Sequence, residues 1–163
     1  MLQKVFMKKI KLFATDVDGT LTDGRFTIDS FGNETKTFNV KDGMAINILK
    51  SRGVKIAVLT NHKSEVVKQR FDILNVDWYF DNCSDKLSVI QKIASEEKIT
   101  LCEIAFIGDD INDLPTLKAV GESGCPSDAV EIVKSVCKFV STKNGGYGCM
   151  REYVEELIKC QKL

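Results

Sequence analysis

The sequence has no net charge and no long apolar run. Its 163 residues carry 23 basic side chains against 23 acidic ones. That balance gives no sign of a general affinity for nucleic acid or for an anionic membrane surface. No apolar stretch approaches the length of a membrane span, and those within residues 1 to 11 are too short for a signal peptide. These absences favour a soluble, cytoplasmic protein.

The sequence also lacks any C-x-x-C spacing, internal repeat or long Pro- or Ser-rich linker. Its six cysteines are scattered, mostly among apolar residues: Cys83, Cys102, Cys125, Cys137, Cys149 and Cys160. This distribution favours reduced thiols over a zinc site or a disulfide framework. The length suits one buried core, so we expect a single domain over residues 1–163.

Apolar strand-like runs alternate with segments of helical period. The runs are 10–14, 55–59, 78–80 and 104–107, and the helical segments are 64–74, 86–97, 114–120 and 150–159. Such alternation implies parallel strands joined by right-handed crossovers, with helices on both faces of the sheet. We therefore predict an α/β fold, a Rossmann-like three-layer sandwich with a mainly parallel sheet.

Residues 25–39 break this alternation. They form two short alternating segments around a polar Gly turn, which predicts a small β-hairpin insertion. The hairpin is too small to seal a site as a cap domain would, so a neighbouring subunit is the natural cover. The alternative interpretation is a mobile surface loop.

Asp16 and Asp18 lie in the segment Asp-Val-Asp-Gly-Thr that directly follows the first apolar run. Open α/β sheets place ligands at the carboxyl ends of strands, where side chains two residues apart can both reach one crevice. An anionic, oxygen-rich pocket suits Mg²⁺, and one carboxylate can attack phosphorus as a nucleophile. Alone, the segment is also compatible with a plain turn.

Three more polar groups follow later strand-like runs. Thr60 and Asn61 end the second run, Lys86 follows the aromatic run, and an acidic stretch from Asp109 to Asp113 follows the fourth. Singly, each has a plainer explanation as a helix cap or a solvated side chain. Their common position at strand ends instead indicates a phosphoryl-transfer site.

In this order the four motifs resemble those of the haloacid dehalogenase superfamily of phosphohydrolases. The chain looks most like its small, capless branch containing 3-deoxy-D-manno-octulosonate 8-phosphate phosphatase. Supporting stretches are Leu21 to Gly24, Phe38 to Gly43, Ser84 to Leu87, Gly145 to Gly148, and Arg151 with Glu152. The resemblance covers nearly the whole chain.

The resemblance implies a role for each motif residue. Asp16 would be the nucleophile, and Asp18 would exchange protons with the leaving alcohol and the attacking water. Thr60 and the N–H of Asn61 would hold phosphoryl oxygens, and Lys86 would neutralise charge. The implied Mg²⁺ ligands are side-chain oxygens of Asp16 and Asp109 and the Asp18 carbonyl, with Asp110 and Asp113 orienting that shell.

The resemblance also implies a sugar-acid substrate and a homotetramer in which the hairpins assemble and the Gly-rich tail approaches an adjacent site. The implied substrate contacts are Asp18, Asn39, Val40, Lys41, Asp42, Gly43, Asn61, His62, Arg70 and Lys86. Two arginines common in octulosonate phosphatases are replaced here by Asn47 and His62, so a nononate or sialate 9-phosphate is a rival substrate. A non-enzymatic alternative is an oligomerisation or regulatory domain like those attached to acylneuraminate cytidylyltransferases.

Overall fold

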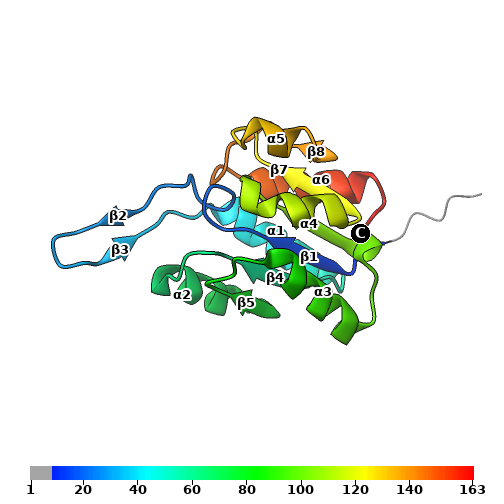
Figure 1. The fold of residues 1–163 in the computed structure, drawn as a ribbon, viewed down its shortest axis with the longest axis horizontal. Coiled ribbons are helices and arrows are strands. Elements are labelled where there is room, and N and C mark those ends of the chain that lie inside the picture. The colour runs from blue at the N-terminus through cyan, green and yellow to red at the C-terminus, as the bar shows by residue number, and fades with distance from the viewer. Residues whose placement is uncertain (1–8) are drawn as a thin grey trace, which may run out of the picture.

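A six-stranded parallel sheet forms the centre of the protein in a computed structural model that describes residues 9–163. In spatial order its strands are β5 (Trp78–Phe80), β4 (Lys55–Leu59), β1 (Leu12–Thr15), β6 (Ile104–Ile107), β7 (Glu122–Cys125) and β8 (Phe139–Val140). Every neighbouring pair is parallel, so the carboxyl ends of all six strands lie at one edge (Figure 1).

Helices cover both faces of the sheet. One face carries α1 (Val40–Ser51), α2 (Glu65–Leu74) and α6 (Cys149–Lys159), and the other carries α3 (Lys86–Glu97), α4 (Leu114–Ala119) and α5 (Glu131–Lys134). Side chains of β1 alternate between the two cores: Phe13 packs with the first set, whereas Leu12 and Ala14 pack with the second. The predicted three-layer α/β fold is confirmed.

Short polar side chains start the helices that follow the site-forming strands. Ser64 accepts the N–H of Val67 at the start of α2, and Asp85 accepts the N–H of Ser88 at the start of α3. The four predicted helical segments are confirmed to within one residue at each end. The sequence analysis did not assign α1, α5, β7 or β8.

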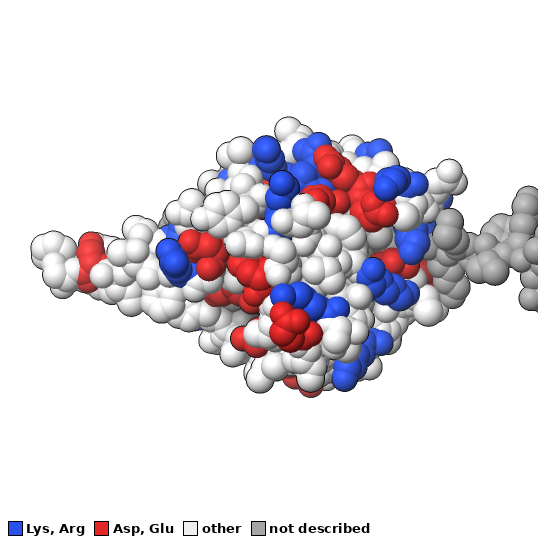
Figure 2. All heavy atoms as spheres, turned by 90° about the horizontal axis from the view of Figure 1, so that it is seen from above, with Lys and Arg blue, Asp and Glu red and all other residues white. Residues whose placement is uncertain are grey.

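The predicted hairpin is confirmed. Strands β2 (Thr27–Ile28) and β3 (Glu34–Thr35) pair antiparallel, and the Asp29 carboxylate closes the turn by accepting the N–H groups of Phe31 and Asn33. The hairpin extends away from the body (Figure 1), and its surface is largely uncharged (Figure 2). Phe26, Ile28 and Phe31 are exposed there.

Within residues 9–163, none of the helices has the length and apolar character needed to cross a membrane. The expectation that residues 1 to 11 are not a signal peptide falls largely outside the described residues.

Candidate active site

The loop after β1 carries the first two carboxylates. The Asp16 N–H donates to the Ile107 carbonyl at 3.0 Å, which ties the end of β1 to the end of β6. Gly19 has a φ of +88°, a left-handed conformation that favours glycine, and a Cβ there would collide with the Asp109 carboxylate. The Gly turn therefore allows the β1 loop and the β6 loop to approach closely.

Lys86 connects two of the site's carboxylates. Its Nζ lies 2.5 Å from Asp16 Oδ1 and 2.6 Å from Asp113 Oδ1, and both Lys86 and Asp113 are almost completely buried. Asp113 Oδ2 in turn accepts the N–H groups of Asp109 and Asp110 at 3.0 and 3.3 Å. Asp113 thus holds both the ammonium and the acidic loop in place.

The electrostatics of this cluster reflect its burial. Burial raises the pKa of Asp16 well above its usual value, and the neighbouring Asp113 adds to this while Lys86 opposes it. Burial, again reinforced by Asp113, raises the pKa of Asp109 to about 6. For Lys86, burial by itself lowers the pKa, but Asp16 and Asp113 outweigh it and raise the pKa overall.

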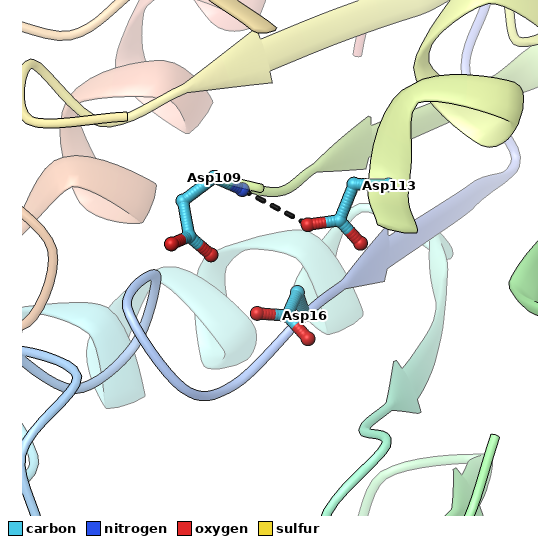
Figure 3. Close-up of side chains that lie close together, drawn as sticks. All are labelled: Asp16, Asp109 and Asp113. Atoms are coloured by element: carbon cyan, nitrogen blue, oxygen red, sulfur yellow. Dashed lines mark hydrogen bonds between the residues drawn. The ribbon is translucent and has the colours of Figure 1, made fainter. Parts of the chain in front are cut away.

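The carboxylates of Asp16, Asp109 and Asp113 point toward one another (Figure 3), and one oxygen from each lies within 4.8 Å of the others. Three carboxylates face one ammonium, so the cluster holds an excess of negative charge that a divalent cation would relieve. Asp113 already has partners for both oxygens. The donor set therefore fits Mg²⁺, with Asp16 and Asp109 as the side chains that have oxygens to spare.

A cleft of about 280 Å³ opens beside this cluster. Its lining brings together predicted site residues from three strand ends: Asp16, Asp18, Thr60, Asn61, His62, Asp109 and Asp110, joined by Asn112. Thr60 is buried, and its hydroxyl accepts the His62 N–H at 3.3 Å. Asp110 is exposed and accepts the N–H of Ile111, its neighbour in the chain.

The structure places the rest of the predicted substrate set elsewhere. Asn39, Asp42, Gly43 and Arg70 line a separate shallow pocket between α1 and α2, Lys41 faces a third depression beside α6, and Val40 is exposed. Asn39 is the N-cap of α1. Within one chain these residues do not line the cleft of Asp16.

The Gly-rich segment 145–148, expected to approach a neighbouring subunit's site, contacts the loop after β1 of its own chain. Gly146 donates its N–H to the Thr20 carbonyl at 3.0 Å, and a Cβ at Gly145 would collide with the Gly19 carbonyl. The glycines thus allow two backbones to pack directly against each other.

Lys36 is a residue beside the site that the sequence analysis did not single out. Its Nζ lies 2.5 Å from Asp18 Oδ1 and 3.4 Å from Glu34 Oε1, and its side chain is fully buried. The alternation of polar residues in Glu34 to Phe38 predicted a strand there, but gave no signal that one lysine would face the cleft.

Comparison with known proteins places this geometry in a family. Residues 39–121, just over half of the chain, match the haloacid dehalogenase-like hydrolase family. The chain is 33% identical over 155 residues to 3-deoxy-D-manno-octulosonate 8-phosphate phosphatase of Haemophilus influenzae, covering 95% of this chain and 86% of the relative.

Solved structures agree. The phosphatase of the same name from Moraxella catarrhalis, in complex with magnesium, phosphate and a KDO molecule, superposes with a TM-score of 0.90 at 36% identity, covering 94% of this chain and 88% of the other. The cobalt-bound enzyme of Haemophilus influenzae superposes with a TM-score of 0.89 at 33% identity, covering 95% of this chain and 91% of the other.

The chain belongs to the haloacid dehalogenase-like hydrolases. Within that family it is similar to the capless octulosonate phosphatase branch, and its class is that of the phosphoric monoester hydrolases. The predicted Mg²⁺ cofactor is confirmed by the carboxylate cluster together with the metal-bound relatives.

Proposed function

We propose that this protein is a Mg²⁺-dependent phosphatase of a 2-keto-3-deoxy sugar acid phosphate. The substrate is 3-deoxy-D-manno-octulosonate 8-phosphate or a nine-carbon relative, a nononate or sialate 9-phosphate. The observation that carries the proposal is the buried array of Asp16, Lys86 and Asp113 beside Asp109, at the sheet edge where ligands bind.

Asp16 and Asp18 have proposed roles in two displacement steps. Asp16 attacks the phosphorus, an aspartyl-phosphate forms, and Asp18 gives a proton to the departing sugar alcohol. Asp18 then takes a proton from the water that attacks the phosphorus and frees Asp16. Bound Mg²⁺ would screen the negative charge of the phosphoryl group from the carboxylates.

The remaining polar groups position the phosphoryl group. Thr60 and the N–H of Asn61 line the cleft and bind phosphoryl oxygens. Lys86, held between Asp16 and Asp113, balances the charge of the nucleophile and of the phosphoryl group. Asp113 accepts hydrogen bonds from Lys86 and from the Asp109 N–H, and these contacts hold the metal-binding loop in position.

Assembly is part of the proposal. We propose that residues 1–163 form one domain, and that the protein is a homotetramer in the cytoplasm. The residues from Asn39 to Gly43, together with His62 and Arg70, then contact the sugar acid where subunits meet. Support comes from the exposed apolar residues Phe26 and Ile28 on the hairpin and from a cleft that is open in one chain.

Phosphate release from a panel of sugar phosphates, with and without Mg²⁺, tests this proposal. The expected result is Mg²⁺-dependent release, fastest from the eight- or nine-carbon sugar acid phosphates. No release from any member, with the protein folded and oligomeric, would instead favour the oligomerisation or regulatory domain.

A further inference from the structure

The hairpin delivers one charged group to the candidate active site. Lys36 follows β3, and its ammonium contacts Asp18 Oδ1 at 2.5 Å although the hairpin itself is largely exposed. The lysine side chain is fully buried, whereas the Asp18 carboxylate is partly exposed toward the cleft. A buried ammonium pointing at a proposed acid and base calls for a functional explanation.

Lys36 is itself held on several sides. Glu34 Oε1 lies 3.4 Å from its Nζ, and the Phe26 ring centre lies 5.7 Å away in cation–π range. These contacts fix the ammonium before any ligand arrives, so little side-chain entropy is lost when it acts.

The same residues attach the hairpin to the loop after β4. Glu34 Oε2 accepts the Ser64 hydroxyl at 2.6 Å, and the Phe26 ring stacks on His62 with ring centres 5.7 Å apart. A continuous set of contacts therefore runs from the start of α2 through the hairpin to Asp18.

Lys36 contacts only one of the two carboxylate oxygens of Asp18, Oδ1. An ammonium group can only donate hydrogen bonds, and its contact with Oδ1 of Asp18 uses one lone pair of that oxygen and stabilises negative charge there. Within residues 9–163, no side chain or backbone N–H donates a hydrogen bond to Oδ2 of Asp18. The Lys36 contact therefore favours Oδ2 as the oxygen that carries any proton Asp18 transfers.

We propose that Lys36 is a positioning residue for Asp18, which fixes the carboxylate so that Oδ2 delivers and removes the proton. This inference rests on the proposed function in one respect, the proton-transfer role of Asp18. Orientation matters because a displacement of about 1 Å in a reacting group costs up to about a hundredfold in rate.

The test compares leaving groups in Lys36→Met and Lys36→Arg. An alkyl leaving group, as in a sugar acid phosphate, needs a proton on departure, whereas the nitrophenolate of 4-nitrophenyl phosphate needs little assistance. We expect Lys36→Met to lower kcat/KM for the sugar phosphate at least about tenfold more than for the aryl phosphate, and Lys36→Arg to restore most of this difference. Equal losses on both substrates would overturn the proposal.

Two controls separate positioning from hairpin damage. In an Asp18→Asn background, Lys36→Met should change neither the ratio of the two substrates nor inhibition by inorganic phosphate. An undiminished effect of Lys36→Met in that background would contradict action through Asp18. Lys92→Met, on the exposed side of α3, provides a matched lysine substitution that should leave the ratio at its wild-type value.

A crystal structure of Lys36→Met gives a readout that does not depend on activity. We expect the Asp18 carboxylate to leave its position there and to keep it in Lys36→Arg. An unmoved Asp18 in Lys36→Met would overturn the inference even in an active enzyme. Failure of the proposed function would instead appear as absence of phosphate release by the wild type, with Asp18 still displaced in the variant.

Discussion

The sheet edge and the hairpin each hold a lysine against a carboxylate, but in different surroundings. Lys86 bonds Asp16 and Asp113 at the ends of central strands, inside the core, whereas Lys36 reaches Asp18 from an insertion with exposed Phe26 and Ile28. The proposed nucleophile, Asp16, is thus held by residues of the core. The proposed acid and base, Asp18, instead contacts a lysine from a segment whose apolar side chains are exposed in the single chain.

The comparison predicts the largest effect for Asp16→Asn, at the sheet edge. Loss of the proposed nucleophile should lower kcat by several orders of magnitude while leaving the circular dichroism and melting temperature close to wild type. Steady-state phosphate release is the measurement, and Asp72→Asn on the exposed surface of α2 is the matched control. More than about a tenth of wild-type kcat in Asp16→Asn would rule out the nucleophile role.

The next largest effect concerns the metal. Asp109→Asn should raise the Mg²⁺ concentration for half-maximal activity about ten- to a hundredfold, because the oxygen-rich cluster loses a charge. The KM for sugar phosphate at saturating Mg²⁺ should change far less. Unaltered metal dependence in Asp109→Asn would show that the acidic loop serves only as a helix cap.

Asp42 is a buried carboxylate that lies outside the cleft and, unlike Asp16 and Asp18, has no lysine partner in the part of the chain that the structure describes. It accepts the Arg151 N–H at 2.9 Å, while its Oδ2 is buried without a partner, and burial raises its pKa to about 6. A raised pKa means that the folded state binds the proton more tightly than the unfolded state. Its contribution to stability is therefore fully present below about pH 4 and is lost as pH rises through about 6.

Asp42→Asn removes this titration. Relative to wild type, its free energy of unfolding should rise between pH 4 and pH 7 by about 2 kcal/mol, on top of a constant offset from the altered hydrogen bonding. Urea denaturation across that pH range measures the slope. A difference between the two proteins that is independent of pH would show that Asp42 titrates normally in the folded state.

The smallest effect is expected from the hairpin surface. Replacing Phe26 and Ile28 together by Ser should shift the protein to smaller species in light scattering, because it removes the exposed apolar surface. Turnover of the sugar phosphate should fall about fivefold, since a cleft left open to water weakens its charge interactions, while a small aryl phosphate keeps most of its turnover. A double variant that stays tetrameric, or a fully active monomer, would refute the dependence on assembly.

The site-forming strands could be predicted from sequence because apolar runs and their polar ends coincide. Strand β7 could not, since its segment Glu-Ser-Gly-Cys has little strand propensity. It is a strand because β6 and β8 flank it and because Gly124 leaves room for the Tyr153 ring. Helix α1 was missed because its first turn contains Gly43, which weakens a helix signal.

Some residues of the site could likewise be predicted from the sequence, and others could not. Asp16, Asp18, Thr60 and Asp109 could be placed together because parallel strands end at one edge. Lys36 could not, because the docking of the hairpin depends on contacts such as Phe26 with His62, which join segments far apart in the chain. Roles of the Asn39 to Gly43 stretch stay predictions, because in one chain it lies outside the cleft.

Chemical trapping of the acyl phosphate tests the central claim most directly. Borohydride added during turnover of the sugar phosphate with Mg²⁺ reduces an aspartyl-phosphate to homoserine, which peptide mass spectrometry locates. The account predicts homoserine at position 16, dependent on substrate and absent in Asp16→Asn. Homoserine at another aspartate, or an unmodified Asp16 under full turnover, would contradict it.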